Sequence, residues 1–576
     1  MTEFSDALAT YADAFADAEM PFVTHYAFDA EKRLVRSTLT RGVFWSLCRR
    51  AAGVLRAAGV SRGACFAHYF SGNRVEDLAF RVGATMVGAV PVTVNWQADT
   101  VERVAYKLEL TQSRLMVVDA GVPAATVDAL STQFPNLVVF ASETLAGEPE
   151  LPEEAFCSDL DASATRIIIF TSGTTGRPKG VRLPYRCYDT NRRTFESFLK
   201  VAPDDRFAPL IVNPLHHTNS TAITDWALRR GGTHLHLVER YATRYWEIVT
   251  ELAAGPFDRI VAPSVSRHFD FLENLKTEGR LPVDVDALKQ AMRRVDFLIG
   301  SAPVGPTTIG RLQAWTGRIP LVRFGSTETC LQVMGTPLDL SETDRLAAFR
   351  RGWAHQYRGE AQGGYYIGRP HPPYTACRVV RAIDRDADEY FVDCDAGEPG
   401  YLITRGDNVM SEYVNDPEAT HAVLHPGGWY TGLRDICFRL RSGADDAWDY
   451  FWMSRDSAML IRGGANTACM QVNAELKTFV IERYGLSGEG FDLAVVGLRL
   501  ESEHEDTCCV TIALTSSEAQ SKRETIAETF LPDAVDAVSK GSRPDRLRFA
   551  EVPRNFKGAI LMSELKQACL DAFEGT

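Results

Sequence analysis

Residues 166–180 read RIIIFTSGTTGRPKG, an apolar run that leads directly into a loop rich in glycine and threonine. A short run of β-branched residues before such a loop is typical of a buried strand. Glycines let a backbone turn so that its N–H groups point at an anion. The hydroxyls of Ser172, Thr174 and Thr175 can donate to phosphate oxygens, and Lys179 adds a positive charge. The ten residues after the strand therefore favour a phosphate-binding loop over an ordinary surface turn, although the spacing is not GxxxxGK[ST].

Helix-like and strand-like segments alternate on the amino-terminal side of this loop. The spacing of apolar residues predicts helices at 42–59 and 75–86. Buried strands are predicted for 65–69, 89–94, 114–120, 136–142 and 166–172. This alternation predicts an α/β fold in which helices flank large parallel or mixed sheets.

The pattern changes after about residue 455. A helix is predicted at 474–485, strands at 491–498, 508–514 and 546–553, and a helical stretch at 517–540. We therefore expect a large domain over residues 1–454 and a small α+β domain over residues 455–576.

The amino-acid composition and net charge exclude several classes of function. The 576 residues are 45% hydrophobic and 24% charged, as in ordinary globular enzymes. A formal net charge of −13 argues against nucleic acid as a partner. None of the twelve cysteines forms a CxxC pair, so we expect buried thiols in a reducing cytosol. No signal peptide and no run of about 18 apolar residues is present, so we expect no membrane span and a cytoplasmic location.

The loop and several later motifs resemble those of the adenylate-forming superfamily, which includes acyl-CoA synthetases, adenylation domains of nonribosomal peptide synthetases and luciferases. In that superfamily ATP adenylates a carboxylate in a large domain, and a small mobile domain serves a second step in which CoA or another acceptor displaces AMP. The resemblance implies ATP, Mg²⁺ and, for many members, CoA. It also implies that the loop residues Thr171, Ser172, Gly173, Thr174, Thr175, Gly176 and Lys179 bind ATP.

Further motifs follow in the family's order. Residues 214–217, PLHH, resemble the segment that lines the acyl pocket, so His216, His217 and Asn219 are expected there. Ser301, Ala302 and Pro303 resemble the turn that lies along adenine.

Residues 324–328, FGSTE, resemble the family's aromatic-Gly-x-Thr-Glu motif. Phe324 and Gly325 are therefore expected at the nucleotide. The resemblance implies that Thr327 holds the α-phosphate and that Glu328 holds Mg²⁺, which neutralises charge as pyrophosphate leaves.

The ribose-binding segment is altered. Residues 428–435, GWYTGLRD, place Leu433 where the family has its aspartate, and Asp435 follows two residues later. We expect Asp435 to replace it, with Arg455 as the second ribose ligand. Gly463 and Gly464 match the turn that enters the site for the thioester step.

Two departures affect catalysis. Ser457 stands where the hinge residue is normally Asp or Lys, and Ala559 stands at the position of the family's catalytic lysine. Lys557 precedes Ala559 by two residues and would face the same side of a strand, so it is the candidate replacement.

Ala559 leaves alternatives open. The chain could be a non-catalytic nucleotide-binding relative, or it could adenylate nitrite instead of a carboxylic acid and pass it to an aryl amine, as diazotases of secondary metabolism do. An amino-acid substrate is disfavoured because residues 218–221 contain no aspartate, although Asp225 follows on a possible helix. The principal expectation is an AMP-forming ligase that joins a small acid to CoA or another acceptor. The sequence does not specify the oligomeric state.

Overall fold

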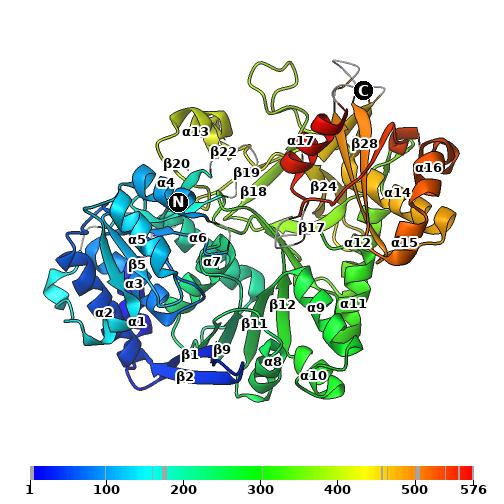
Figure 1. The fold of residues 1–576 in the computed structure, drawn as a ribbon. Helices are drawn as coiled ribbons and strands as arrows, with labels where there is room; N and C mark the ends of the chain where they lie inside the picture. Colours follow the sequence, from blue (N-terminus) through cyan, green and yellow to red (C-terminus); the bar gives the residue numbers. More distant parts are fainter. Residues whose placement is uncertain are drawn as a thin grey trace.

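The strand that precedes the glycine-rich loop lies inside a sheet of seven strands among the described residues (Figure 1). The computed structural model describes residues 6–97, 99–157, 160–171, 178–300, 303–455, 458–462, 465–498, 500, 506–538, 540–554, 558 and 560–573. In spatial order the strands are β20 (Glu412–Tyr413), β8 (Gly180–Pro184), β7 (Thr165–Phe170), β4 (Val90–Thr93), β3 (Cys65–Tyr69), β5 (Leu115–Val118) and β6 (Val138–Ala141). The strands from β7 to β6 are parallel, and β8 and β20 are added antiparallel.

Two closely packed helices accompany this sheet, α2 (Arg41–Ala57) and α3 (Val75–Val87). The hydroxyl of Thr40 caps α2 by accepting the N–H of Val43 at 3.4 Å. A Cβ on Gly83 would lie 2.7 Å from the carbonyl oxygen of Cys48, so the close approach of the two helices requires glycine. The other helices of this region are α1 (Ala7–Ala14), α4 (Val101–Thr111) and α5 (Ala124–Gln133).

A second, larger sheet continues through the middle of the chain. Its parallel part is β1 (Pro21–Phe28), β10 (Leu235–Val238), β9 (Phe207–Ile211), β11 (Arg259–Ser264), β12 (Val295–Ile299) and β13 (Leu321–Phe324), with β2 (Leu34–Thr40) antiparallel at the edge. Beyond β13 the sheet is antiparallel through β14 (Met334–Gly335), β17 (Tyr365–Pro370), β24 (Trp448–Arg455), β23 (Asp435–Arg441), β19 (Gly400–Arg405), β22 (Trp429–Tyr430) and β21 (Leu424–His425), and β18 (Ala376–Val380) pairs with β19. A short hairpin is formed by β15 (Gln356–Tyr357) and β16 (Glu360–Ala361).

Helices connect the parallel strands of this second sheet. Figure 1 shows α8, α9, α10 and α11 beside β11 and β12. The connecting helices are α7 (Thr218–Leu228), α8 (Tyr245–Ala254), α9 (Ser266–Thr277), α10 (Val285–Met292) and α11 (Pro306–Thr316). Three further helices lie outside these connections: α6 (Tyr185–Leu199) precedes β9, α12 (Glu342–Trp353) follows β14, and α13 (Pro417–Val423) follows β20.

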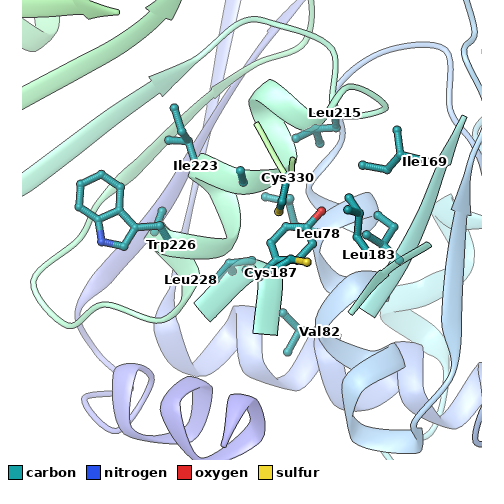
Figure 2. Packing of buried hydrophobic residues seen from close by; sticks show 14 of the residues in the cluster. Leu78, Val82, Ile169, Leu183, Cys187, Leu215, Ile223, Trp226, Leu228 and Cys330 are labelled. Atoms are coloured by element: carbon teal, nitrogen blue, oxygen red, sulfur yellow. The ribbon is translucent and has the colours of Figure 1, made fainter. Parts of the chain in front are cut away.

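A hydrophobic cluster contains side chains from both sheets and from the helices between them. Figure 2 shows Leu78 and Val82 of α3, Ile169 of β7 and Leu183 of β8 gathered with Ile223 and Trp226 of α7 and with Cys330. Burial of large apolar side chains contributes about 1.5–3 kcal/mol each. The cluster therefore fixes the two sheets relative to each other.

The carboxyl-terminal residues have a separate core. Three strands, β27 (Phe491–Leu498), β28 (Thr507–Leu514) and β29 (Arg546–Phe549), pack with α14 (Cys469–Tyr484), α15 (Ser517–Ser521), α16 (Arg523–Ala537) and α17 (Met562–Phe573), and β25 (Met459–Arg462) pairs with β26 (Ala465–Ala468). Among the described residues, the clusters of this core begin at Leu460, whereas the two large clusters end at Met453. Figure 1 shows these elements grouped at one side, in orange to red.

The expected mixed α/β fold with flanking helices is confirmed, and two local predictions are wrong. Residues 136–142 were predicted as a buried strand, but β6 is the edge of its sheet and Val138 is exposed. The helix predicted at 517–540 is two helices, because the chain leaves helical geometry at Lys522. Nine of the twelve cysteines are buried, and all are free thiols, as expected. None of the described helices is long and apolar enough to cross a membrane.

Candidate active site

The two strands that flank the glycine-rich loop are direct neighbours. β7 and β8 pair antiparallel with Phe170 opposite Gly180, and the N–H of Thr171 donates to the carbonyl oxygen of Lys179 at 3.0 Å. The loop is therefore closed at its base and brings Lys179 back to the end of β7. The predicted ATP ligands Ser172, Gly173, Thr174, Thr175 and Gly176 lie outside the described residues.

The FGSTE motif forms a tight turn at the end of β13. A Cβ on Gly325 would lie 1.5 Å from the carbonyl oxygen of Leu331, so only glycine fits where the chain returns on itself. Cys330 and Leu331 have positive φ values of 48° and 88°. Residues held in such conformations cost of order 1–3 kcal/mol and cluster at functional sites. The turn is held by backbone hydrogen bonds from Leu331 to Ser326 at 2.9 Å and from Cys330 to Thr327 at 3.0 Å.

Tyr413 connects this turn to the glycine-rich loop. Its hydroxyl donates a 3.0 Å hydrogen bond to Oε1 of Glu328, and Nζ of Lys179 lies 4.9 Å from the centre of its ring. The position of Tyr413 follows from strand pairing, because β20 pairs with β8 and places Tyr413 opposite Val181. A cation over an aromatic face contributes about 0.5–2 kcal/mol. Lys179 and Glu328 are 149 positions apart in the chain, and both contact Tyr413.

Tyr430 extends this cluster toward the predicted ribose ligands. It is fully buried, and burial raises its pKa well above 10, with the carboxylate of Glu328 acting in the same direction. The hydroxyls of Tyr430 and Tyr413 are hydrogen-bonded to each other. Both phenols are therefore neutral and available as hydrogen-bond groups at physiological pH.

Asp435 and Arg455 lie opposite each other on neighbouring strands. They are paired residues of β23 and β24, and Nε of Arg455 lies 3.4 Å from Oδ1 of Asp435. Nε1 of Trp452 donates to the same oxygen at 2.8 Å. The Asp435 side chain is 5% exposed and that of Arg455 57% exposed. Burial raises the pKa of Asp435, and Arg455 and Trp452 oppose that shift.

Leu433, which a direct overlay puts at the family's aspartate position, contributes to the largest hydrophobic cluster. Asp435 is influenced by the charge of Glu328, which raises its pKa further and places the two carboxylates in one region. The structure thus packs Leu433 among apolar side chains and puts the carboxylate of Asp435 within electrostatic reach of Tyr430 and Glu328.

The histidine segment lies at the start of α7. His217 precedes the first residue of the helix, its ring is 4.3 Å from that of His216, and the ring of Trp96 lies 6.2 Å from His216. His216 also lines a small cavity with His68, Phe70 and Trp96. Oδ1 of Asn219, in the first turn of α7, accepts a hydrogen bond from Arg323 of β13.

Asp225 does lie on α7, but it faces the core rather than the histidines. It accepts a hydrogen bond from Tyr11 at 2.6 Å and pairs with Arg166 and Arg229. Its charge is therefore already compensated, which agrees with the expectation that the substrate is not an amino acid held through its amine.

Several predicted site residues lie outside the described part of the chain. These are Ser301 and Ala302 of the adenine turn, Ser457 at the hinge position, Gly463, Gly464, Lys557 and Ala559. Pro303 is described and is partly buried.

Sequence reasoning missed Tyr413, Tyr430, Trp452 and Arg323. Tyr430 and Arg323 lie inside or directly beside the recognised motifs, at GWYTG and before FGSTE, so their position was a usable signal. Tyr413 and Trp452 belong to no recognised motif, and only strand pairing brings them to the site.

Comparison with known proteins identifies the family. Residues 23–414 match the model of the family described as AMP-binding enzyme. The chain belongs to the AMP-binding enzyme family. Among curated members, it is 26% identical to the long-chain-fatty-acid–CoA ligase FadD13 of Mycobacterium tuberculosis over 534 residues, which is 91% of each chain. It is 24% identical to the crotonobetaine/carnitine–CoA ligase of Salmonella paratyphi B over 540 residues, covering 90% of this chain and 91% of that ligase.

Solved structures of AMP-binding enzymes share the fold over nearly the whole chain. ATP-bound MatB from Rhodopseudomonas palustris aligns with a TM-score of 0.74 at 19% identity, covering 99% of this chain and 100% of that chain. The o-succinylbenzoate CoA synthetase MenE from Bacillus subtilis, solved with its acyl-adenylate intermediate, aligns with a TM-score of 0.72 at 19% identity, covering 98% and 99%.

Proposed function

We propose that this AMP-binding enzyme is an ATP-dependent, AMP-forming ligase that adenylates a small carboxylic acid and transfers the acyl group to CoA. The observation that carries the proposal is the convergence of Lys179 and Glu328 on Tyr413, with Asp435 nearby. A cation, a carboxylate and a buried acid in one place are suited to the phosphates, the metal ion and the ribose of ATP. The CoA ligases named above support the acyl-CoA product.

In this proposal each predicted residue has a defined role. Residues 171–176 and Lys179 hold the phosphates, and Thr327 holds the α-phosphate. Asp435 and Arg455 bind the ribose. The adenine side of the nucleotide is bound by Ser301, Ala302, Pro303, Phe324 and Gly325. His216, His217 and Asn219 line the acid's pocket. Lys557 supplies the cation that Ala559 lacks.

Mg²⁺ fits Glu328. Oε1 of Glu328 accepts from Tyr413, which orients the carboxylate. The described residues contain no cluster of three or more His, Cys, Asp or Glu side chains that could hold a metal by themselves. Mg²⁺ is commonly bound by one or two carboxylates plus substrate phosphates, so this is the arrangement expected for an ion that arrives with ATP. When bound, the ion neutralises charge on the departing pyrophosphate.

The division into residues 1–454 and 455–576 is part of the same proposal. The core clusters change between Met453 and Leu460, which supports a boundary there. A small domain with its own core can change its orientation between adenylation and transfer without unfolding.

The test is ATP–pyrophosphate exchange across a panel of short, medium and long carboxylic acids, followed by mass spectrometry of products formed with CoA. We expect exchange with at least one acid and a CoA thioester of that acid, both lost in Lys179→Ala. ATP binding without exchange for any acid would instead identify a non-catalytic nucleotide-binding protein. An arm with nitrite and an aryl amine covers the diazotase alternative that Ala559 raises, although neither CoA ligase named above supports it. This experiment supports a diazotase only if the amount of diazo product with enzyme exceeds the amount in the enzyme-free control.

A further inference from the structure

Arg323 is a buried cation without a counter-ion among the residues that the structure describes. Its side chain is 4% exposed, and Nη2 donates to Oδ1 of Asn219. Nε and Nη1 are buried and have no hydrogen-bond partner among the described residues, and no carboxylate of those residues forms an ion pair with it. Burial lowers the pKa of Arg323 to about 9, so the side chain remains charged at neutral pH.

Among the described residues, four of the six other buried arginines have acidic partners, whereas Arg41 and Arg230 donate to backbone carbonyl oxygens instead. Arg81 pairs with Asp77, Arg166 and Arg229 pair with Asp225, and Arg345 pairs with Glu342 at 3.1 Å. An unpaired buried charge is strongly unfavourable, which is why such groups are normally paired. The guanidinium of Arg323 therefore has the character of a binding group whose partner is a ligand.

The place of Arg323 in the fold is where a ligand would reach it. Arg323 is the penultimate residue of β13, next to the FGSTE turn. Gly300 follows the end of neighbouring β12, and a Cβ on it would lie 3.4 Å from Cγ of Arg323, so Arg323 packs directly against the chain where β12 ends. Ligands of open α/β sheets bind beyond the carboxyl ends of parallel strands, and β9, β11, β12 and β13 are parallel. Asn219 contacts Arg323 from the first turn of α7, which His217 directly precedes.

We propose that Arg323, supported by Asn219, binds a second anionic group of the acid substrate, so that the enzyme selects dicarboxylic acids. This inference rests on the proposed ligase function. Nη1 is unused and Nη2 carries a second N–H beside the one given to Asn219, and these two nitrogens together form the planar fork that matches the two oxygens of a carboxylate. The carboxylate that is activated loses its charge when it is joined to AMP, and would leave Arg323 unpaired again. A second carboxylate remains charged from binding to release.

A binding experiment tests this inference without requiring the ligase reaction. The melting temperature of the full-length protein is measured with malonate, succinate, glutarate and adipate, and with acetate, propionate, butyrate and hexanoate as monocarboxylate controls, in buffers of equal ionic strength. We expect at least one dicarboxylate to raise the melting temperature of the wild type and the monocarboxylates not to do so. In Arg323→Met this response is lost, while the melting temperature without ligand is unchanged or higher, because an unpaired charge has been removed.

Arg345→Met is the matched control, since it removes a buried arginine that is already paired. It lowers the melting temperature without ligand and leaves the dicarboxylate response intact. Asn219→Ala provides a second variant if Arg323→Met does not fold, and it weakens the response because it removes the group that orients Arg323.

Kinetics complete the test. In ATP–pyrophosphate exchange, Arg323→Met raises the KM for the preferred dicarboxylate at least tenfold, and Arg323→Lys recovers part of the loss. A wild type that responds equally to monocarboxylates, or an Arg323→Met variant that keeps the dicarboxylate response, would overturn the inference. Stabilisation by a dicarboxylate without any exchange would instead leave the anion site standing and refute the proposed ligase function.

Discussion

The hydroxyl of Tyr413 donates a 3.0 Å hydrogen bond to Oε1 of Glu328, while the ring of the same tyrosine lies 4.9 Å from Nζ of Lys179. One side chain thus uses its polar end for a carboxylate and its aromatic face for a cation. Burial raises the pKa of Tyr413 above its usual value of 10, so it donates this bond throughout the neutral range. We infer that Tyr413 positions Glu328 and Lys179 for the metal–phosphate end of ATP.

Replacement of Tyr413 separates its two contacts. Tyr413→Phe keeps the ring beside Lys179 and removes the hydrogen bond to Glu328, which for a charged acceptor is worth about 1.5–3 kcal/mol. We expect the Mg²⁺ concentration for half-maximal exchange to rise about tenfold in Tyr413→Phe. Tyr413→Leu removes both contacts and should also raise the KM for ATP. Equal Mg²⁺ dependence of wild type and Tyr413→Phe would show that Tyr413 does not position Glu328.

Asp435 is predicted to take the place of the family's ribose-binding aspartate. Asp435→Asn should raise the KM for ATP about tenfold, since loss of a charge-assisted hydrogen bond costs about 1.5 kcal/mol. The measurement is exchange as a function of ATP concentration.

The complementary variant Leu433→Asp restores the family's residue at the overlaid position. Because Leu433 contributes to the largest hydrophobic cluster, an aspartate there should lower the free energy of unfolding by about 3 kcal/mol. We also expect it not to rescue Asp435→Asn. Rescue of ATP binding by Leu433→Asp would show that Asp435 is not the ribose ligand.

Lys557 is the predicted source of the catalytic cation. Removal of one preorganised electrostatic group usually costs about 10²–10³ in rate. Lys557→Ala should therefore slow adenylation at least 100-fold while ATP binding, measured by calorimetry, changes little. The double variant Lys557→Ala with Ala559→Lys should regain part of the rate. An unchanged adenylation rate in Lys557→Ala would exclude this role.

Acid sensitivity is expected from buried histidines. Burial lowers the pKa of His268 from 6.5 to about 4, so the unfolded chain binds this proton more readily than the folded protein. As the pH falls from 6.5 toward 4, His268 is protonated in the unfolded chain before it is protonated in the folded protein. This difference lowers the free energy of unfolding by about 2 kcal/mol at pH 5. His371, whose pKa burial also lowers to about 4, acts in the same direction.

Urea unfolding at pH 7 and pH 5 measures this effect. His268→Phe should lose less stability between the two pH values than the wild type. Tyr241→Phe keeps the ring that stacks on His268 at 4.6 Å and should retain the wild-type difference. If the His268→Phe protein loses as much stability as the wild type, His268 is not a source of the acid sensitivity.

Local sequence patterns were sufficient for most elements of the fold. The strand predicted at 65–69 is β3 to the residue, and the strand at 491–498 is β27. Both are short apolar runs bounded by turn residues, so local preference and burial agree there. β6 was mispredicted as buried because apolar content does not reveal which strand stands at the edge of a sheet.

The sequence by itself determined the family, through TSGTTGRPKG and FGSTE, because such tight local motifs need particular residues at fixed spacing. The tertiary structure alone decided that Tyr413 lies between Lys179 and Glu328 and that the carboxylate of Asp435 lies within electrostatic reach of Glu328. It also decided that Arg323 is buried without a counter-ion among the described residues. The physical reason is that spacing along the chain records local geometry, whereas the pairing of β8 with β20 and of β23 with β24 joins residues that are distant in sequence. Whether a charge has a partner depends on such long-range neighbours and is settled only when the chain folds.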